Sequence, residues 1–152
     1  MQKDAFVTKV LESEETLYKI SMSMLKNEKD CEDVVQDTIL TAYNKLNSLK
    51  NESYFKTWLV RILINKCNEQ LRKKKRTTPD MQLVKAYDTD NHEITEVRIA
   101  LDNLPDDIRY VMVMHYIENF TIKEIQEVLK IPQGTVKSRL SRGRELLRLE
   151  LK

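Results

Sequence analysis

The chain has 152 residues, a formal net charge of +2 and 41% hydrophobic residues. Two glycines and three prolines are too few for the turns of a hairpin-rich β fold or for a glycine-rich phosphate loop, so we expect an all-α fold. Two cysteines far apart in the sequence and two histidines fit neither a disulfide scaffold nor a zinc site, and we expect no metal ion and no cofactor.

Basic side chains gather in two blocks of the sequence. Residues 61–76 carry seven basic and one acidic side chain, and residues 135–152 carry six and two. Residues 1–60 and 77–134 have net charges of −2 and −6. The small net charge therefore conceals two basic segments, each of which follows an acidic stretch.

The first predicted helices are amphipathic. Leu17, Ile20 and Met24 recur at helical spacing. A second helix, capped by Asp30, would bury the side chains of Cys31, Val35, Ile39, Ala42 and Leu46. Its outer side carries an exposed leucine among acids and amides, namely Asp33, Gln36, Asp37, Leu40 and Asn44. This composition is typical of a protein-binding surface, although a solvated helix face explains the periodicity equally well.

A third helix is predicted over residues 54–75, after the polar turn 47–53. Arg61, Asn65, Asn68 and Arg72 follow one another at spacings of 4, 3 and 4, and a basic run over residues 72–76 ends the stripe. With Trp58 near its start, this side offers the aromatic surface, amides and cations that bind an unstacked nucleic-acid base. Taken alone, Trp58 also fits a core position.

Helical periodicity lapses over residues 77–95, which we interpret as a flexible linker, and resumes near Glu96. Pro105 then opens a helix that would bury Ile108, Val111, Met112 and Tyr116. Asn119 can adopt the left-handed conformation in the turn that follows. Thr121 and Glu124 form a capping box at the start of a short helix.

The short helix and the last helix, from Thr135 onward, describe a helix-turn-helix with a tight turn that contains Gly134. The outer face of the last helix is basic and hydroxylic, with Lys137, Ser138, Ser141, Arg142, Glu145 and Arg148 outward and Arg139 and Arg144 at the flanks. Such side chains contact guanine edges and phosphates in the major groove. The alternative is a solvated basic helix whose arginines complement its dipole.

Catalytic motifs are absent from the sequence, so we expect a protein that is not an enzyme. His115 falls in an apolar helical pattern, where a structural role is the default. The N-terminus has no signal-peptide pattern and no apolar stretch is long enough to span a membrane, which predicts a cytoplasmic protein.

Three stretches, in this order, resemble the extracytoplasmic-function (ECF) sigma factors of bacterial RNA polymerase. They are DVVQDT at residues 33–38, FKTWL at residues 55–59, and the segment from Leu104-Pro105 through Glu124-Ile125 to GTVKSR at residues 134–139. The resemblance implies two small helical domains: a region 2 domain over residues 1–76, the linker 77–95 and a region 4 domain over residues 96–152.

The resemblance also implies a function and its residues. The protein would bind core polymerase, recognise the −10 and −35 promoter elements, promote melting and initiate transcription of a stress or envelope regulon. Residues implied to bind the polymerase core are Asp30, Asp33, Val34, Gln36, Asp37, Leu40 and Tyr43. Residues implied to bind −10 DNA are Asn47, Ser48, Lys50, Asn51, Ser53, Trp58, Arg61, Asn65 and Arg72. Residues implied to bind −35 DNA are Lys137, Ser138, Arg139, Ser141, Arg142 and Arg144.

The implied partners are core polymerase, through its β′ clamp and β subunits, promoter DNA and a membrane-bound anti-sigma factor. No small-molecule substrate is implied. The anti-sigma factor would hold the inactive protein at the membrane. The main alternative is a helix-turn-helix transcriptional regulator with an N-terminal helical interaction domain, which leaves the basic block at residues 61–76 without a role.

Overall fold

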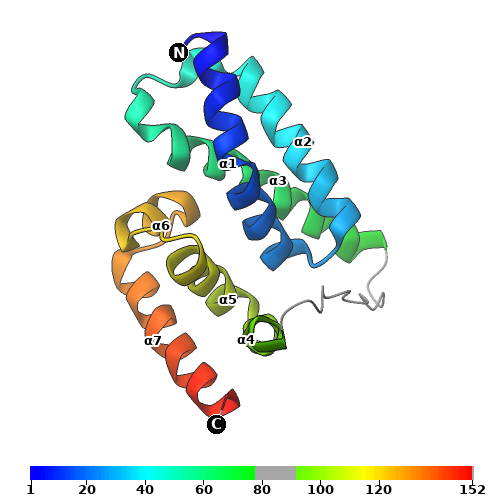
Figure 1. The fold of residues 1–152 in the computed structure, drawn as a ribbon, viewed down its shortest axis with the longest axis vertical. Helices are drawn as coiled ribbons and strands as arrows, with labels where there is room; N and C mark the ends of the chain where they lie inside the picture. Colours follow the sequence, from blue (N-terminus) through cyan, green and yellow to red (C-terminus); the bar gives the residue numbers. More distant parts are fainter. Residues whose placement is uncertain (78–91, 152) are drawn as a thin grey trace. The chain divides into compact units, whose positions relative to one another are not determined.

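The computed structural model describes residues 1–77 and 92–151 (Figure 1). The chain divides into two compact units, Met1–Leu83 and Val84–Lys152. All regular structure in the described residues is helical, which confirms the all-α prediction. Within the same residues, no helix combines the length and the apolar character needed to cross a membrane. Most of the predicted linker lies outside the described residues.

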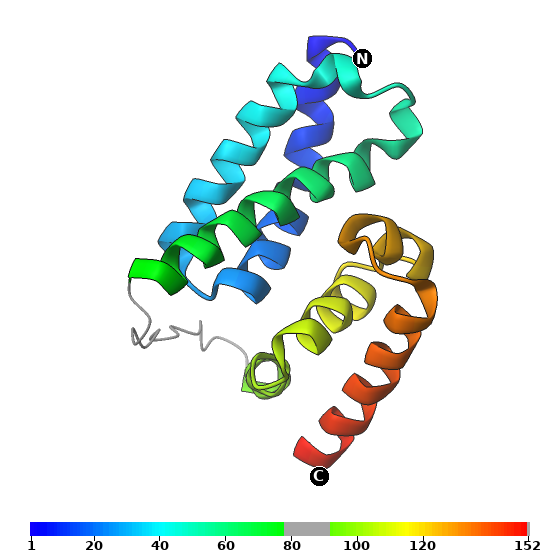
Figure 2. The same ribbon diagram turned by 180° about the vertical axis from the view of Figure 1, so that it is seen from behind.

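The N-terminal unit is built from three helices, α1 (Lys3–Leu25), α2 (Glu28–Asn44) and α3 (Phe55–Thr77). Each packs against the other two, and α1 crosses α3 when the unit is seen from either side (Figures 1 and 2). The core side chains are mostly apolar and include Phe6, Leu17, Ile20, Cys31, Leu59, Leu63 and Cys67. Two short 3₁₀ turns, η1 (Leu46–Ser48) and η2 (Glu52–Tyr54), connect α2 to α3.

The start of α2 differs from the sequence prediction. Lys26 ends α1 in the left-handed conformation, with φ of 54°, and the side chain of Asn27 accepts a hydrogen bond from the Asp30 backbone N–H at 3.0 Å. Asn27 is therefore the N-cap, and the predicted cap at Asp30 is wrong. Asparagine is among the best N-cap residues, so the first capping signal in the sequence prevails over the second.

The C-terminal unit comprises α4 (His92–Asp102), α5 (Asp106–Met112), the π-helical turn η3 (Val113–Ile117), α6 (Ile122–Leu129) and α7 (Gln133–Glu150). Helix α4 begins four residues before the predicted return of helical periodicity near Glu96. Helices α5 and α7 pack closely at Gly143, where an added Cβ would lie 2.5 Å from Sδ of Met112. Glycine at this position is what allows the two helices to approach.

The π-helical turn η3 changes which side chains reach the core. The backbone N–H of Glu118 bonds to the Val113 carbonyl at 3.0 Å, five residues back, so one extra residue fits into this turn. As a result Val113 and Met114 are buried, whereas Tyr116 is 48% exposed. The predicted burial of Tyr116 is therefore wrong, because a regular helical period does not hold through the turn.

The helix-turn-helix is confirmed, with one correction to its turn. The capping box is present: the Thr121 backbone N–H bonds to Glu124 Oε1 at 2.9 Å, and the Glu124 backbone N–H bonds to Thr121 Oγ1 at 3.1 Å. Asn119 has the predicted left-handed conformation, with φ of 61°. In the turn between α6 and α7, however, the left-handed residue is Lys130, with φ of 56°, and Gly134 lies inside α7.

Candidate nucleic-acid interface

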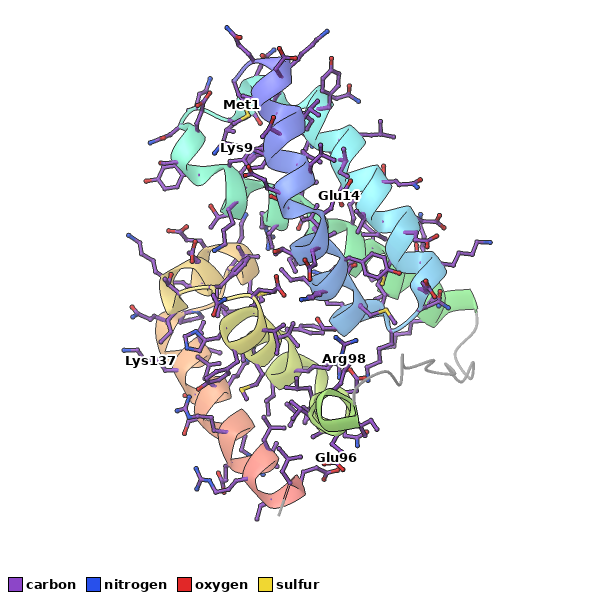
Figure 3. All side chains as sticks on the ribbon, viewed as in Figure 1. Met1, Lys9, Glu14, Glu96, Arg98 and Lys137 are labelled. Carbon is purple, nitrogen blue, oxygen red and sulfur yellow. The ribbon has the colours of Figure 1, made fainter. Side chains whose placement is uncertain are left out.

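One face of α7 is exposed and basic. Lys137, Ser141, Arg144 and Arg148 lie along it at spacings of 4, 3 and 4, and Ser138 and Arg142 are exposed beside them. Figure 3 shows Lys137 on this helix. The opposite face is anchored by the buried residues Val136, Leu140 and Gly143. A rigid helix that presents cations and hydroxyls on one side has the chemistry to contact DNA bases and phosphates.

The α7 arginines differ in their partners. Nη1 of Arg142 lies 3.3 Å from Glu145 Oε2 within the helix, and Nε of Arg139 lies 3.7 Å from Asp107 Oδ2 at the start of α5. Arg144 donates to the hydroxyl of Tyr116. Arg139 is only half exposed and has a carboxylate partner, so it is the least available of the predicted −35 residues. Ser138 donates its hydroxyl hydrogen to the Gly134 carbonyl at 2.9 Å.

Two polar residues of the C-terminal unit have structural roles. Arg109 is 1% exposed; its Nη1 donates to the Leu104 carbonyl at 2.8 Å, and its Nη2 pairs with Asp106 at 2.6 Å. His115 Nδ1 lies 2.8 Å from the Phe120 carbonyl, which confirms the structural interpretation of that histidine. Sequence analysis missed Arg109, because its spacing of three from Asp106 is equally typical of a surface ion pair.

In the N-terminal unit, Trp58 joins α3 to the preceding polar turn. Its indole N–H donates to Ser48 Oγ at 3.3 Å, and its ring contacts that of Phe55 with centroids 5.9 Å apart. Ser48 in turn donates to the Lys45 carbonyl at 2.6 Å. Trp58 is half-buried, so it serves the packing of the unit and still offers surface to a ligand.

The other predicted −10 residues lie in the connection from η1 to η2 and along α3, where Arg72 is close to the far end of the helix. Asn51 Oδ1 accepts hydrogen bonds from the Ser53 backbone N–H at 3.0 Å and from the Ser53 hydroxyl at 2.8 Å, so Asn51 caps η2 and Ser53 holds the cap in place. The remaining residues are exposed, except for the half-buried Arg61: Asn47, Lys50, Asn65 and Arg72. Tyr54, 58% exposed at the end of η2, is an aromatic residue on this surface that sequence analysis missed.

Two lysines of α3 pair with α2. Lys66 Nζ lies 3.2 Å from Asp37 Oδ2, and Lys74 Nζ lies 2.5 Å from Asp30 Oδ2. Part of the basic block therefore braces the N-terminal unit. The spacing of charges in the sequence does not distinguish such braces from cations that remain available to phosphates.

The outer face of α2 contains most of the predicted polymerase-binding residues. Leu40 is 63% exposed and Tyr43 is 41% exposed, and Asp33, Gln36 and Asp37 are exposed near them. Val34 is an exception, because its side chain is 6% exposed and packs in the core. The structure therefore places Val34 among the core residues and separates it from this surface.

The two cysteines lie in the core of the N-terminal unit. Burial raises the pKa of the Cys67 thiol to about 12 and also raises the pKa of Cys31. Both remain protonated at neutral pH, which makes them poor nucleophiles and poor metal ligands. Among the described residues, no three or more His, Cys, Asp or Glu side chains form a group that could hold a metal ion.

Comparison with known proteins matches both units. Residues 10–77 match the family model Sigma-70 region 2, and residues 94–147 match Sigma-70, region 4. The chain is 34% identical to the ECF RNA polymerase sigma factor SigW of Bacillus subtilis, over 99% of this chain and 90% of that relative. It is 28% identical to the ECF RNA polymerase sigma-E factor of Haemophilus influenzae, over 94% of this chain and 92% of the relative.

Two solved structures are also similar to this chain. The chain resembles the sigma factor RpoE of Bartonella quintana, solved in complex with the anti-sigma factor NepR, with a TM-score of 0.87 and 27% identity over 97% of this chain and 96% of that one. It also resembles CnrH, solved with the cytosolic domain of CnrY, with a TM-score of 0.76 and 27% identity over 99% of this chain and 89% of that one.

Proposed function

The chain belongs to the extracytoplasmic-function group of the sigma-70 family, and on this basis we propose which of its surfaces contact core polymerase and promoter DNA. Its function is that of an RNA polymerase sigma factor, which acts in transcription initiation. The alternative, a helix-turn-helix regulator with an N-terminal interaction domain, does not account for the match of residues 10–77 to sigma-70 region 2.

The two compact units correspond to the two domains. The sequence places the region 2 domain at residues 1–76, the linker at residues 77–95 and the region 4 domain at residues 96–152. Because α4 begins at His92, we propose instead a linker over residues 77–91 and a region 4 domain over residues 92–152. The proposal that each unit binds a different promoter element rests on one observation: the two units have separate cores, and each has an exposed basic face.

The C-terminal unit binds the −35 element through α7. The capping box fixes the start of α6, and the close approach of α5 and α7 at Gly143 fixes the orientation of α7 within its unit. Base edges are read from the exposed part of α7 that follows its N-terminus, where Lys137, Ser141 and Arg142 lie. Ser138 and Arg144 add contacts to the DNA backbone, and Arg139 has to leave Asp107 to do the same.

The N-terminal unit captures the opened −10 strand on the surface around Trp58. Melting costs on the order of 1.4 kcal/mol per base-pair step in lost stacking. Stacking of an unpaired base on an aromatic side chain returns roughly 1 to 3 kcal/mol. Trp58, Asn65 and Arg72 supply the ring, the amide and the cation, while Ser48 holds the adjoining turn in place. Melting opens several base-pair steps whereas the Trp58 ring stacks on one base, so capture alone does not offset the cost of melting and polymerase has to hold the duplex.

The outer face of α2 binds the polymerase core. Leu40 and Tyr43 are large apolar side chains left exposed among polar ones, as in the centre of a protein interface. Asp33, Gln36 and Asp37 form the polar rim, and Asp30 is partly covered by Lys74. We place the β′ clamp opposite this face.

An anti-sigma factor is the proposed regulator. Support comes from a structural relative, the sigma factor RpoE, which was solved in complex with the anti-sigma factor NepR. A second structural relative, CnrH, was solved in complex with the cytosolic domain of CnrY. We propose that the anti-sigma factor of this chain is a membrane protein, that it holds the sigma factor at the cytoplasmic side of the membrane, and that release switches on a stress or envelope regulon.

Run-off transcription tests the proposed function. Core polymerase is supplied with or without the full chain and with a library of randomised promoter fragments. We expect selected fragments to share two conserved elements, at −10 and −35, and to be transcribed only when the chain is present. Selected fragments with one element alone would contradict the assignment of the two units.

A further inference from the structure

Tyr116 and Arg144 meet across the C-terminal unit. Nη1 of Arg144 donates a hydrogen bond to the Tyr116 hydroxyl at 3.0 Å, although the two residues are 28 positions apart. Arg144 lies on the exposed face of α7 and Tyr116 in the π-helical turn η3. The bond therefore ties the proposed DNA-binding helix to a turn that itself carries none of the predicted DNA-binding residues.

Contacts with His115 hold the Tyr116 ring in place. The Tyr116 ring lies edge-to-face against the His115 ring, with centroids 4.8 Å apart and an interplanar angle of 81°. His115 Nδ1 is held 2.8 Å from the Phe120 carbonyl, and the Phe120 backbone N–H bonds to the Met114 carbonyl at 2.9 Å. The extra residue of the π turn is what turns Tyr116 outward instead of into the core.

The chemistry of this contact differs from that of the neighbouring arginines. Arg142 and Arg139 face the carboxylates of Glu145 and Asp107, which offset their charge. A phenol is neutral at physiological pH and takes up only one of the N–H donors of a guanidinium. Arg144 thus keeps its full positive charge and further donors, while its long side chain is already restrained.

We propose that Tyr116 is a positioning residue for DNA binding, which holds Arg144 in the conformation that contacts a DNA phosphate. The inference rests on the proposed binding of the −35 duplex by α7. An unrestrained arginine loses rotamer freedom when it binds, whereas Arg144 has lost that freedom during folding, so binding costs less. The Tyr116 hydroxyl itself needs no contact with DNA.

The test is a double-mutant cycle with holoenzyme that contains the full chain. Tyr116→Phe removes the hydroxyl and keeps the ring that packs on His115. We expect holoenzyme with Tyr116→Phe to bind a duplex carrying a selected −35 element about 2- to 10-fold more weakly. In an Arg144→Ala background the same substitution is expected to cause no further loss. Tyr110→Phe, on α5, is the matched control and is expected to act independently of Arg144.

Salt dependence separates positioning from a general structural defect. Arg144→Ala is expected to lower the slope of log affinity against log salt by about 0.9, the loss of one phosphate contact. Tyr116→Phe keeps the contact and is expected to leave the slope unchanged, with an unfolding midpoint no lower than that of Arg144→Ala, which loses the same hydrogen bond. A lowered slope for Tyr116→Phe would overturn the positioning role.

Two further outcomes overturn the inference. One is unchanged affinity for Tyr116→Phe; the other is a Tyr116→Phe loss that persists in full without Arg144, because the hydroxyl then acts on its own. Both leave the proposed function intact if the holoenzyme still distinguishes an intact −35 element from a scrambled one. Failure to distinguish those two duplexes would refute the −35 assignment, and the inference with it.

Discussion

Trp58 and Ser48 are joined by a hydrogen bond from the indole N–H to the hydroxyl oxygen, at 3.3 Å. The bond ties the first turn of α3 to η1, ten residues earlier in the chain, and Ser48 continues it to the Lys45 carbonyl. The polar turn proposed to contact the −10 element is therefore held against the helix that carries Asn65 and Arg72. This connection gives Trp58 a part in shaping the surface as well as in stacking.

Ser48→Ala tests that connection. Ser48→Ala removes the bond from Trp58 and the bond to the Lys45 carbonyl, each worth about 0.5–1.5 kcal/mol, so we expect the lifetime of the open complex to fall by at least about 2-fold. Trp58→Phe removes only the bond to Ser48 and is expected to have a smaller effect, and the two substitutions together are expected to cost no more than Ser48→Ala alone. Ser13→Ala, which removes a hydroxyl bonded to the Lys9 carbonyl on α1, is the control. An open-complex lifetime as long in Ser48→Ala as in Ser13→Ala contradicts the role of the bond.

The two glycines of the chain are expected to respond in opposite directions to alanine. A Cβ on Gly143 would lie 2.5 Å from Sδ and 2.6 Å from Cγ of the buried Met112, and overpacking of a core typically costs about 1–3 kcal/mol. Helix propensity returns at most about 1 kcal/mol of this. Gly134 has nothing within 4 Å of its Cβ position, so Gly134→Ala is expected to stabilise α7 slightly.

Hydrogen exchange of the amides in α5 and α7 measures both effects. Faster exchange in Gly143→Ala and unchanged or slower exchange in Gly134→Ala are the expected results. Equal protection in the two variants would mean that Met112 moves aside without cost.

Arg142→Ala distinguishes base recognition from phosphate contact. Arg142 is proposed to read a base, so its loss is expected to cost about 1–3 kcal/mol in −35 binding and to relax the preference at one promoter position. Holoenzyme binding to duplexes with each single substitution in the −35 element gives the pattern. A uniform loss across all duplexes makes Arg142 a phosphate contact instead.

The buried Cys67 makes stability depend on alkaline pH. Its pKa rises from the usual 9.0 to about 12 in the folded unit because of burial. Above pH 9 the unfolded chain releases the thiol proton while the folded unit keeps it. The free energy of unfolding therefore falls as the pH rises, by about 1.4 kcal/mol per pH unit from this group, until the pH reaches the folded-state value.

Denaturant unfolding followed by the fluorescence of Trp58, the single tryptophan of the chain, reports on the N-terminal unit. Between pH 9 and pH 11, Cys67→Ala is expected to lose stability less steeply than wild type. Parallel pH profiles would show that the Cys67 thiol ionises equally in both states. Cys31 is buried in the same core and remains in both proteins.

Local signals in the sequence predict much of the fold. The capping box at Thr121 and the left-handed Asn119 follow from residue type alone and are confirmed. The conformation of the turn in the helix-turn-helix does not follow from residue type, because Lys130 adopts the left-handed conformation while Gly134 is helical. That conformation costs about 1–2 kcal/mol for a residue with a side chain, and packing of the flanking helices offsets the cost in a way that the local sequence does not reveal.

The candidate surfaces show the same limit. Exposure of Leu40 and of the α7 face follows from helical periodicity. Helical periodicity does not predict the partners of Lys74, Arg139 and Arg144, because each of these side chains bonds to a residue on a different helix or turn. Tyr116 was predicted to be buried because an inserted residue in a π turn leaves no mark on a 3.6-residue pattern.

Transcription from matched duplex and premelted promoters tests the division of labour between the two units most directly. The two templates share one selected promoter and differ only in a noncomplementary −10 segment. We predict that Asn65→Ala reduces run-off transcription from the duplex and that premelting restores it, whereas Arg142→Ala reduces transcription from both templates. Equal rescue of the two variants by premelting, or rescue of neither, would contradict the account.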